Sequence, residues 1–151
     1  MSRSRIHSRR FAVPADAIDV NGHVSNLAYV AWMQEIAIEH STVAGWPVER
    51  YRAIGAAWVV RSHFVEYLRP AFAGDLVSAH TWVPRFDHRA APRRYLFVRD
   101  DDRRVLAQAE TRWVFIDLAT GRRRPLPEDL VGAFEVVPEE AEVRRTLGLS
   151  P

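Results

Sequence analysis

One carboxylate stands in a polar turn that leads directly into an apolar segment with helical periodicity. In the stretch AIDVNGHVSNLAYVAWMQE, Ala17 to Glu35, Asp19 is followed by Gly22 and His23, and the apolar run begins after Asn26. A carboxylate can attack a carbonyl carbon or activate water. The free N–H groups at a helix start favour a developing negative charge. The spacing therefore suits acyl transfer, with Asp19 as nucleophile or base and the N–H groups of residues 24–26 as an oxyanion site.

Each of these residues also has a purely structural interpretation. Asp19 could be a turn or capping residue, because Asp and Asn before Gly commonly have that role. Gly22 could let the backbone approach closely or could only supply a positive φ angle. His23 could be a hydrogen-bonded group that orients the turn, and Asn26 could be the N-cap of the helix. From the residues alone these alternatives stay open.

The rest of the chain offers few competing reactive groups. Cysteine is absent and no Gly-x-Ser-x-Gly word occurs, which excludes thiolate chemistry and the usual serine nucleophile. Glu35 and Glu39 lie one helical turn apart, but no histidine or aspartate spacing supports a metal beside them. We interpret this pair as a polar strip at a helix edge or a subunit contact. No metal and no cofactor are expected.

The composition favours one globular domain. The chain has 151 residues, of which 48% are hydrophobic, so we expect a single domain over residues 1–151 with its core at about 11–134 and short charged tails. The formal charge of +2 is too small for a protein that coats nucleic acid. No uncharged apolar stretch reaches membrane-spanning length. We expect a soluble cytoplasmic protein that binds neither nucleic acid nor membrane.

The periodicity changes along the chain from helical to strand-like. An edge strand interrupted by Pro14 is expected near 11–18, and residues Asn26 to about Ala44 predict a long buried helix, which Gly45 and Pro47 end. The stretch VERYRAIG predicts a second, short helix. Four later segments have strand composition and turns between them: Ala57–Arg69, Leu76–Val83, Arg94–Arg99 and Val105–Asp117.

These elements predict an α+β fold. We expect the four strands to form a consecutive antiparallel meander whose apolar face wraps the long helix. The tail after Pro138 is expected to be a short exposed helix or a frayed end.

The chain resembles the hotdog-fold acyl thioesterases of the hydroxybenzoyl-CoA and acyl-carrier-protein thioesterase type. The resemblance is carried by DVNGHVSNLAY from Asp19, FVEYLRPAFAGDLV from Phe64 and AETRWVFIDLATGRRRPLP from Ala109. Two positions depart from the family pattern. Ala17 stands where many relatives have a second aspartate, and Ser25 replaces the first of two paired asparagines.

The resemblance implies an acyl-CoA or acyl-carrier-protein thioesterase, with coenzyme A only as part of the substrate. It implies a homodimer, or a dimer of dimers, with active sites at the dimer interface. Asp19, His23 and Asn26 are then the expected catalytic residues. The expected substrate-binding residues are Gly22, Val24, Ser25 and Trp32, with arginines of two loop-like clusters for the CoA phosphates: Arg85, Arg89, Arg93, Arg94, Arg122, Arg123 and Arg124.

Three other functions remain as alternatives. A hydratase or dehydratase on the same fold would need a catalytic histidine in sequence words that this chain lacks. A non-catalytic acyl-CoA sensor is a second alternative, although the chain has no room for a DNA-binding partner domain. An RNA-binding role would need an exposed aromatic platform, which the sequence does not predict.

Overall fold

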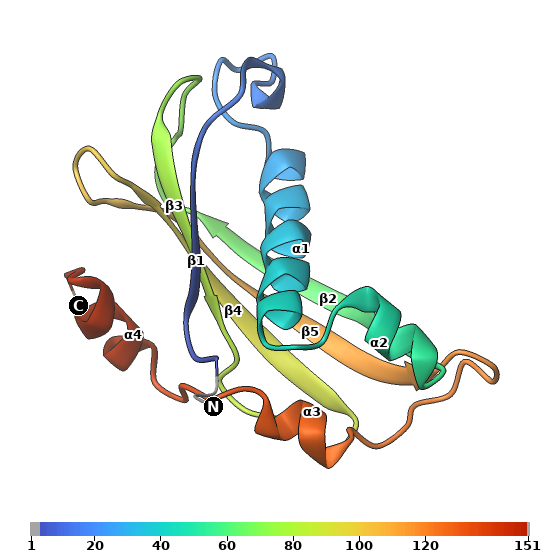
Figure 1. Cartoon of the computed structure of the whole chain (residues 1–151). Helices are drawn as coiled ribbons and strands as arrows, with labels where there is room; N and C mark the ends of the chain where they lie inside the picture. Colours follow the sequence, from blue (N-terminus) through green and yellow to red (C-terminus); the bar gives the residue numbers. More distant parts are fainter. Residues whose placement is uncertain (1–3, 151) are drawn as a thin grey trace.

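The computed structural model describes residues 4–150, so the outermost ends of the predicted domain lie outside the described part. One long helix lies against a curved antiparallel sheet, which confirms the α+β class (Figure 1). The strands are β1 (His7–Ala12), β2 (Ala56–Tyr67), β3 (Leu76–Trp82), β4 (Ala90–Arg99) and β5 (Val105–Asp117). The helices are α1 (Asn26–Val43), α2 (Val48–Ala53), α3 (Glu128–Gly132) and α4 (Glu140–Leu147), with a 3-10 turn at Ala15–Ala17.

The central helix α1 forms as predicted and starts at a side-chain cap. Ser25 is the N-cap, and its Oγ accepts a hydrogen bond from the N–H of Ala28 at 3.1 Å. Gly45, with φ 94°, and Pro47 follow the end of the helix. Buried residues recur at three- and four-residue spacing along the face that packs on the sheet: Tyr29, Met33, Ile36, Ala37 and His40.

The strand order corrects the predicted meander. The order is β1-β3-β4-β5-β2, so β3, β4 and β5 form a meander, whereas β2 pairs with β5 and not with β3. Alternation in the sequence predicts which face of a strand is buried but not which strand lies beside it. The segment 68–75 therefore crosses the end of the sheet, and β2 is left as an edge strand.

Two strand boundaries also differ from the prediction. Strand β4 begins at Ala90 and includes Pro92. Strand β3 ends at Trp82, opposite Arg94, so residues 90–93 pair only with β5. A proline is tolerated there because this part of β4 lies at an edge of the sheet. The first strand is indeed an edge strand, but it occupies His7–Ala12 instead of 11–18. Pro14 follows it as the cap of the 3-10 turn.

Both faces of the sheet are covered. Tyr95 and Phe97 of β4 lie on the α1 side, whereas Leu96 and Val98 belong to a core cluster on the opposite face with Val143 of α4. Val143 has 0% exposure, which corrects the expectation of a merely exposed or frayed tail. A third cluster lies on the α1 side under α2 and α3.

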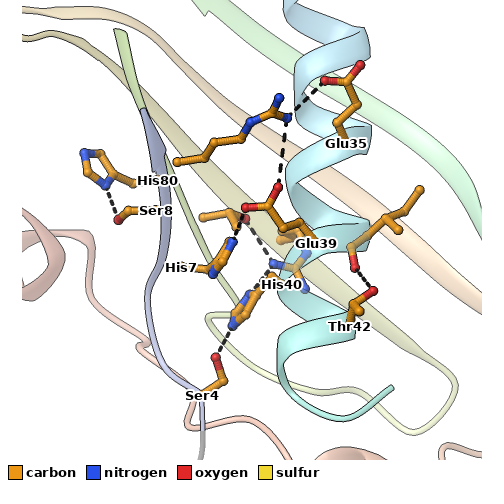
Figure 2. Close-up of polar contacts among 12 residues, drawn as sticks. Ser4, His7, Ser8, Glu35, Glu39, His40, Thr42 and His80 are labelled. Atoms are coloured by element: carbon orange, nitrogen blue, oxygen red, sulfur yellow. Dashed lines mark hydrogen bonds and ion pairs between the residues drawn. The ribbon is translucent and has the colours of Figure 1, made fainter. Parts of the chain in front are cut away.

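The outer edge of α1 is tied to β1 by polar contacts. Glu39 hydrogen-bonds His7 at 2.7 Å (Figure 2), and Glu35 contacts Arg9 at 3.3 Å. The two glutamates are thus a polar strip that contacts a strand of the same chain. Among residues 4–150, no helix is both long and apolar enough to span a membrane.

Candidate active site

Asp19 begins a tight turn that holds it at the edge of a cleft. Its carbonyl accepts the N–H of Gly22 at 3.0 Å, and its own N–H donates to the carbonyl of His23 at 3.0 Å. Its carboxylate Oδ1 accepts the N–H of Asn21 at 2.8 Å. Oδ2 has no hydrogen-bond partner within residues 4–150. Asp19 therefore is the turn residue of the structural interpretation, and its second oxygen is still available for chemistry.

Gly22 is needed for its backbone conformation. Its φ of 84° lies in the left-handed region, where side chains are strained. A Cβ placed there would meet nothing within 4 Å. Of the two roles considered for this glycine, the structure supports the positive φ and shows no close approach of another part of the chain.

A cleft of about 520 Å³ brings the predicted catalytic residues together at the start of α1. Asp19, His23 and Asn26 line it, with Val24 beside them. The opposite wall comes from the end of β2 and the loop after it. Most of the predicted motif residues thus share one solvent-accessible space, whereas Gly22 and Ser25 do not line it.

The N–H groups at the helix start are not all free. The N–H of Val24 donates to Ala71 O at 2.8 Å, and that of Ser25 donates to Ala17 O at 2.9 Å. The expected oxyanion site included the N–H groups of Val24 and Ser25, and these two are not free to hold an oxyanion. Within the described residues, the N–H groups of Asn26 and Leu27 have no acceptor, because the first turn of a helix lacks the preceding carbonyls.

The side chains around these N–H groups have separate roles. Ser25, not Asn26, is the N-cap of α1. The serine that replaces the first of the paired asparagines therefore supplies the capping oxygen. The Asn26 carbonyl lies 3.5 Å from the Tyr67 hydroxyl. The His23 ring is half-buried and packs edge-on against Phe72, with 6.4 Å between ring centroids.

Several residues that line the cleft were not predicted from the sequence, among them Tyr29, Tyr67 and Arg69. Tyr29 lies in the quoted motif, but its place in the apolar run predicts a core residue of the helix. Its hydroxyl is buried without a partner in the described chain, and burial, with Tyr67 nearby, raises its pKa to about 12. It therefore stays a neutral hydrogen-bond donor. The Tyr-Leu-Arg word at the end of β2 was the only available signal for the other two.

Trp32 does not lie in the Asp19 cleft. Its ring packs against Phe11 of β1 and Tyr29, with centroids 4.8 Å and 5.3 Å apart. It borders a separate hollow of about 160 Å³ between α1 and β1. In this chain Trp32 is thus mainly a packing residue between helix and edge strand.

The arginines are divided by the structure. Arg93 and Arg94 lie in strand β4 and not in a loop; Arg93 is buried, and Arg94 contacts Glu110 at 3.3 Å on the outer face. Four others are exposed in the connections β3–β4 and β5–α3: Arg85, Arg89, Arg122 and Arg123. Arg124 is half-buried and donates to Ile54 O at 2.9 Å.

The exposed arginines lie at the opposite end of the sheet from Asp19 (Figure 1). The β5–α3 connection follows Asp117, which pairs with Ala56 at the start of β2, whereas the Asp19 cleft is lined by Tyr67 at its end. At about 3.3 Å per residue, the strand between them spans roughly 36 Å. One protomer therefore does not bring its own arginine loops to its own Asp19.

Comparison with known proteins places this geometry in a family. The model of the thioesterase-like superfamily matches residues 13–134. A palmitoyl-acyl carrier protein thioesterase, chloroplastic, from Gossypium hirsutum is 26% identical over 136 residues, which are 86% of this chain and 33% of that protein. The chain thus spans about a third of that relative's length.

Solved structures show the same fold. A 1,4-dihydroxy-2-naphthoyl-CoA thioesterase from Synechocystis superposes with a TM-score of 0.78 at 18% identity, covering 85% of this chain and 94% of that one. A putative oleoyl thioesterase from Lactobacillus plantarum gives 0.82 at 19% identity, covering 90% and 54%. The predicted hotdog fold is confirmed.

Proposed function

The chain belongs to the thioesterase-like superfamily, and we propose that it hydrolyses an acyl-CoA or acyl-carrier-protein thioester. We place this reaction at Asp19. The observation that carries the proposal is the shared cleft: Asp19, whose carboxylate has one oxygen without a partner, and Asn26, whose N–H has no acceptor within the described residues, line the same space. The products are a free acid and a free thiol.

In the proposed reaction, the thioester carbonyl oxygen lies at the N–H groups of Asn26 and Leu27. These donors are fixed by the helix before the reaction begins, and the helix dipole adds a favourable field for the oxyanion. Asp19 Oδ2 attacks the carbonyl carbon or takes a proton from an attacking water, while the Asn21 N–H holds Oδ1 and so orients the carboxylate.

The test is Asp19→Asn, which removes the charge but keeps the shape. Hydrolysis should fall by roughly a hundredfold or more, the usual cost of losing a nucleophile or general base. Free thiol can be followed across short, long and aromatic acyl-CoAs, and the protein contributes no thiol background because it has no cysteine.

The matched control is Asp16→Asn, an exposed acid in the neighbouring 3-10 turn. It removes the same charge nearby and should leave the rate within about twofold, since it touches no group of the cleft. Near-full activity in Asp19→Asn on a substrate that the parent protein cleaves well would show that the assignment is wrong.

Isotope labelling tests for a covalent role of Asp19. During a single turnover in oxygen-18 water, label found on the Asp19 carboxylate would mean that a mixed anhydride forms and that water attacks it at the enzyme's carbonyl. Label found only in the released acid would mean that water adds to the acyl carbonyl, either of the thioester or of the anhydride.

We also propose a homodimer in which β2 pairs with the β2 of a second copy. The outer edge of β2 is unpaired within the described chain, and Phe64 and Tyr67 are exposed on this strand. Antiparallel pairing would bring the β5–α3 arginines of one copy toward the Asp19 cleft of the other. Such a dimer supports phosphate binding by Arg122 and Arg123, which one copy alone does not bring to the cleft.

A further inference from the structure

A second cavity, of about 350 Å³, lies at the far end of α1 from Asp19. Its walls are mostly apolar, and six aromatic side chains contribute to them: Trp46, Tyr51, Trp58, Phe86, Trp113 and Phe134. Its volume is at the small end of the range for small-molecule sites, which are typically apolar with few polar groups. The walls would suit a compact apolar or aromatic body.

Two arginines line this apolar cavity: Arg52 of α2, which is exposed, and Arg93, which is buried. Arg93 lines it from strand β4 and has only 6% exposure. Within residues 4–150, no carboxylate forms an ion pair or hydrogen bond with it; Nη1 donates to His40 Nδ1 at 2.8 Å and to Thr81 Oγ1 at 3.1 Å. Its Nε and Nη2 have no partner there. Arg93 is thus a buried guanidinium at the cavity wall with two nitrogens that lack a protein acceptor.

The partner of Arg93 on α1 is itself neutral. Burial, together with Arg93 and His7, lowers the pKa of His40 to about 2. With Nδ1 accepting from Arg93, His40 Nε2 donates to Ser4 Oγ at 2.8 Å, a contact shown in Figure 2. His40 thus orients the guanidinium without balancing its charge.

A buried charge without a counter-charge is unfavourable by several kcal/mol, so such groups are normally paired. Arginine also keeps its proton in proteins, so it cannot escape the cost by becoming neutral. A planar guanidinium with a free edge matches a carboxylate, which can accept two parallel hydrogen bonds. A carboxylate entering the cavity would supply the missing charge.

We propose that this cavity is a binding site for a small apolar or aromatic carboxylate, held by the free edge of Arg93. The carboxylate would lie against Arg93 and the apolar body against the aromatic walls.

The site is separate from the Asp19 cleft of the same chain. The cavity takes its α1 residues from Ala37, Ile38 and Ser41, whereas the cleft uses Asn26 and Tyr29. At 1.5 Å per residue, the two sets are roughly 12–22 Å apart along the helix. The proposal stands without the proposed hydrolysis, because binding at Arg93 needs no reaction at Asp19.

The test titrates the intact protein with phenylacetate and with phenylacetamide, its uncharged counterpart of similar shape. Three tryptophans line the cavity, so binding can be followed by tryptophan fluorescence and checked by calorimetry. Phenylacetate should bind at least about tenfold more tightly, because hydrogen bonds between charged groups are about twice as strong as neutral ones. Isovalerate with isovaleramide repeats the comparison for an aliphatic body.

Arg93→Met keeps an unbranched apolar stem and removes the charge and the N–H donors. This variant should lose the preference for the acid while keeping the affinity for the amide. The matched control is Arg112→Met, an exposed arginine on β5 opposite Pro92, which should retain the full preference. Equal binding of acid and amide by the parent protein, or no binding of either acid at millimolar concentration, would overturn the proposal, whether or not Arg93→Met folds.

A second measurement identifies the source of the carboxylate. Adipoyl-CoA and hexanoyl-CoA have acyl chains of equal length, but only adipoyl-CoA has a distal carboxylate. A preference for adipoyl-CoA that Arg93→Met removes would mean that the cavity holds the end of an acyl group. Acid binding without such a preference would mean that the cavity takes a free acid. If hydrolysis is not observed at all, the titration still decides the proposal.

Discussion

The oxyanion site can be tested by deleting one backbone N–H with proline at position 26. Asn26 is the first residue of α1, where proline is favoured because its fixed φ suits the helix and no N–H is needed. Ser25 has φ −72° and ψ 152°, an extended conformation that a following proline allows. The Asn26 N–H has no acceptor within the described residues, so Asn26→Pro breaks no hydrogen bond of the fold.

The expected effects on stability and on catalysis therefore separate. The free energy of unfolding should stay unchanged or rise by up to about 1 kcal/mol, because proline restricts the unfolded chain. The value of kcat should fall by about a hundredfold to a thousandfold, or about 2.7–4 kcal/mol of transition-state stabilisation, the usual loss for one oxyanion donor.

The control is Asn26→Ala, which removes the same side chain but keeps the N–H. Thiol release measures kcat for both variants, and urea unfolding measures their stability. If Asn26→Pro is as stable as Asn26→Ala and its kcat lies within about threefold of it, the N–H of residue 26 does not hold the oxyanion.

Three further predictions follow from packing and charge. Burial first, and then nearby charges, lowers the pKa of His40 to about 2 and that of His80 to about 4. Below pH 6.5 the unfolded state therefore binds more protons than the folded state. The free energy of unfolding, measured in urea, should fall by about 2 kcal/mol per histidine from pH 7 to pH 5. Equal stability at both pH values would contradict the burial of these histidines in their neutral form. Val143→Ala should lower the free energy of unfolding by about 2 kcal/mol, because two buried methyl groups are lost; an unchanged urea midpoint would contradict its packing role. Replacing Arg122 and Arg123 with alanine should raise KM for acyl-CoA and make it less sensitive to salt, with little change in kcat; an unmoved KM would mean that they are only solvated.

Local sequence patterns predicted the elements of this fold well. Each of the successful predictions depends on a short stretch of chain: the helical spacing of α1, the glycine and proline that follow it, and the alternation in β5. The position of β2 beside β5 depends on the path of residues 68–75, which no local pattern specifies. The burial of Val143 likewise requires knowing that the outer face of the sheet is apolar near Leu96 and Val98.

The candidate site was predicted in part. The spacing of Asp19, Gly22 and Asn26 within one turn and helix start brought the acid and the N–H groups together. Which N–H groups are free could not be predicted, because the acceptors for Val24 and Ser25 are carbonyls of Ala71 and Ala17. The burial of Arg93 was not predicted, because Pro92, Arg93 and Arg94 have the composition of a turn. In the structure they belong to β4, which continues past the end of β3.

The packing of α4 has a consequence for higher assembly. The apolar part of the outer sheet face is already filled by Val143 and Leu149 of the chain's own C-terminal region. The outer face further along β4 and β5 presents Arg94, Glu110 and Gln108, with Gln108 contacted by Arg144 of α4 at 3.3 Å. Two dimers stacked through these faces would therefore meet across helices and charged side chains, as a hydrated contact whose strength falls with salt.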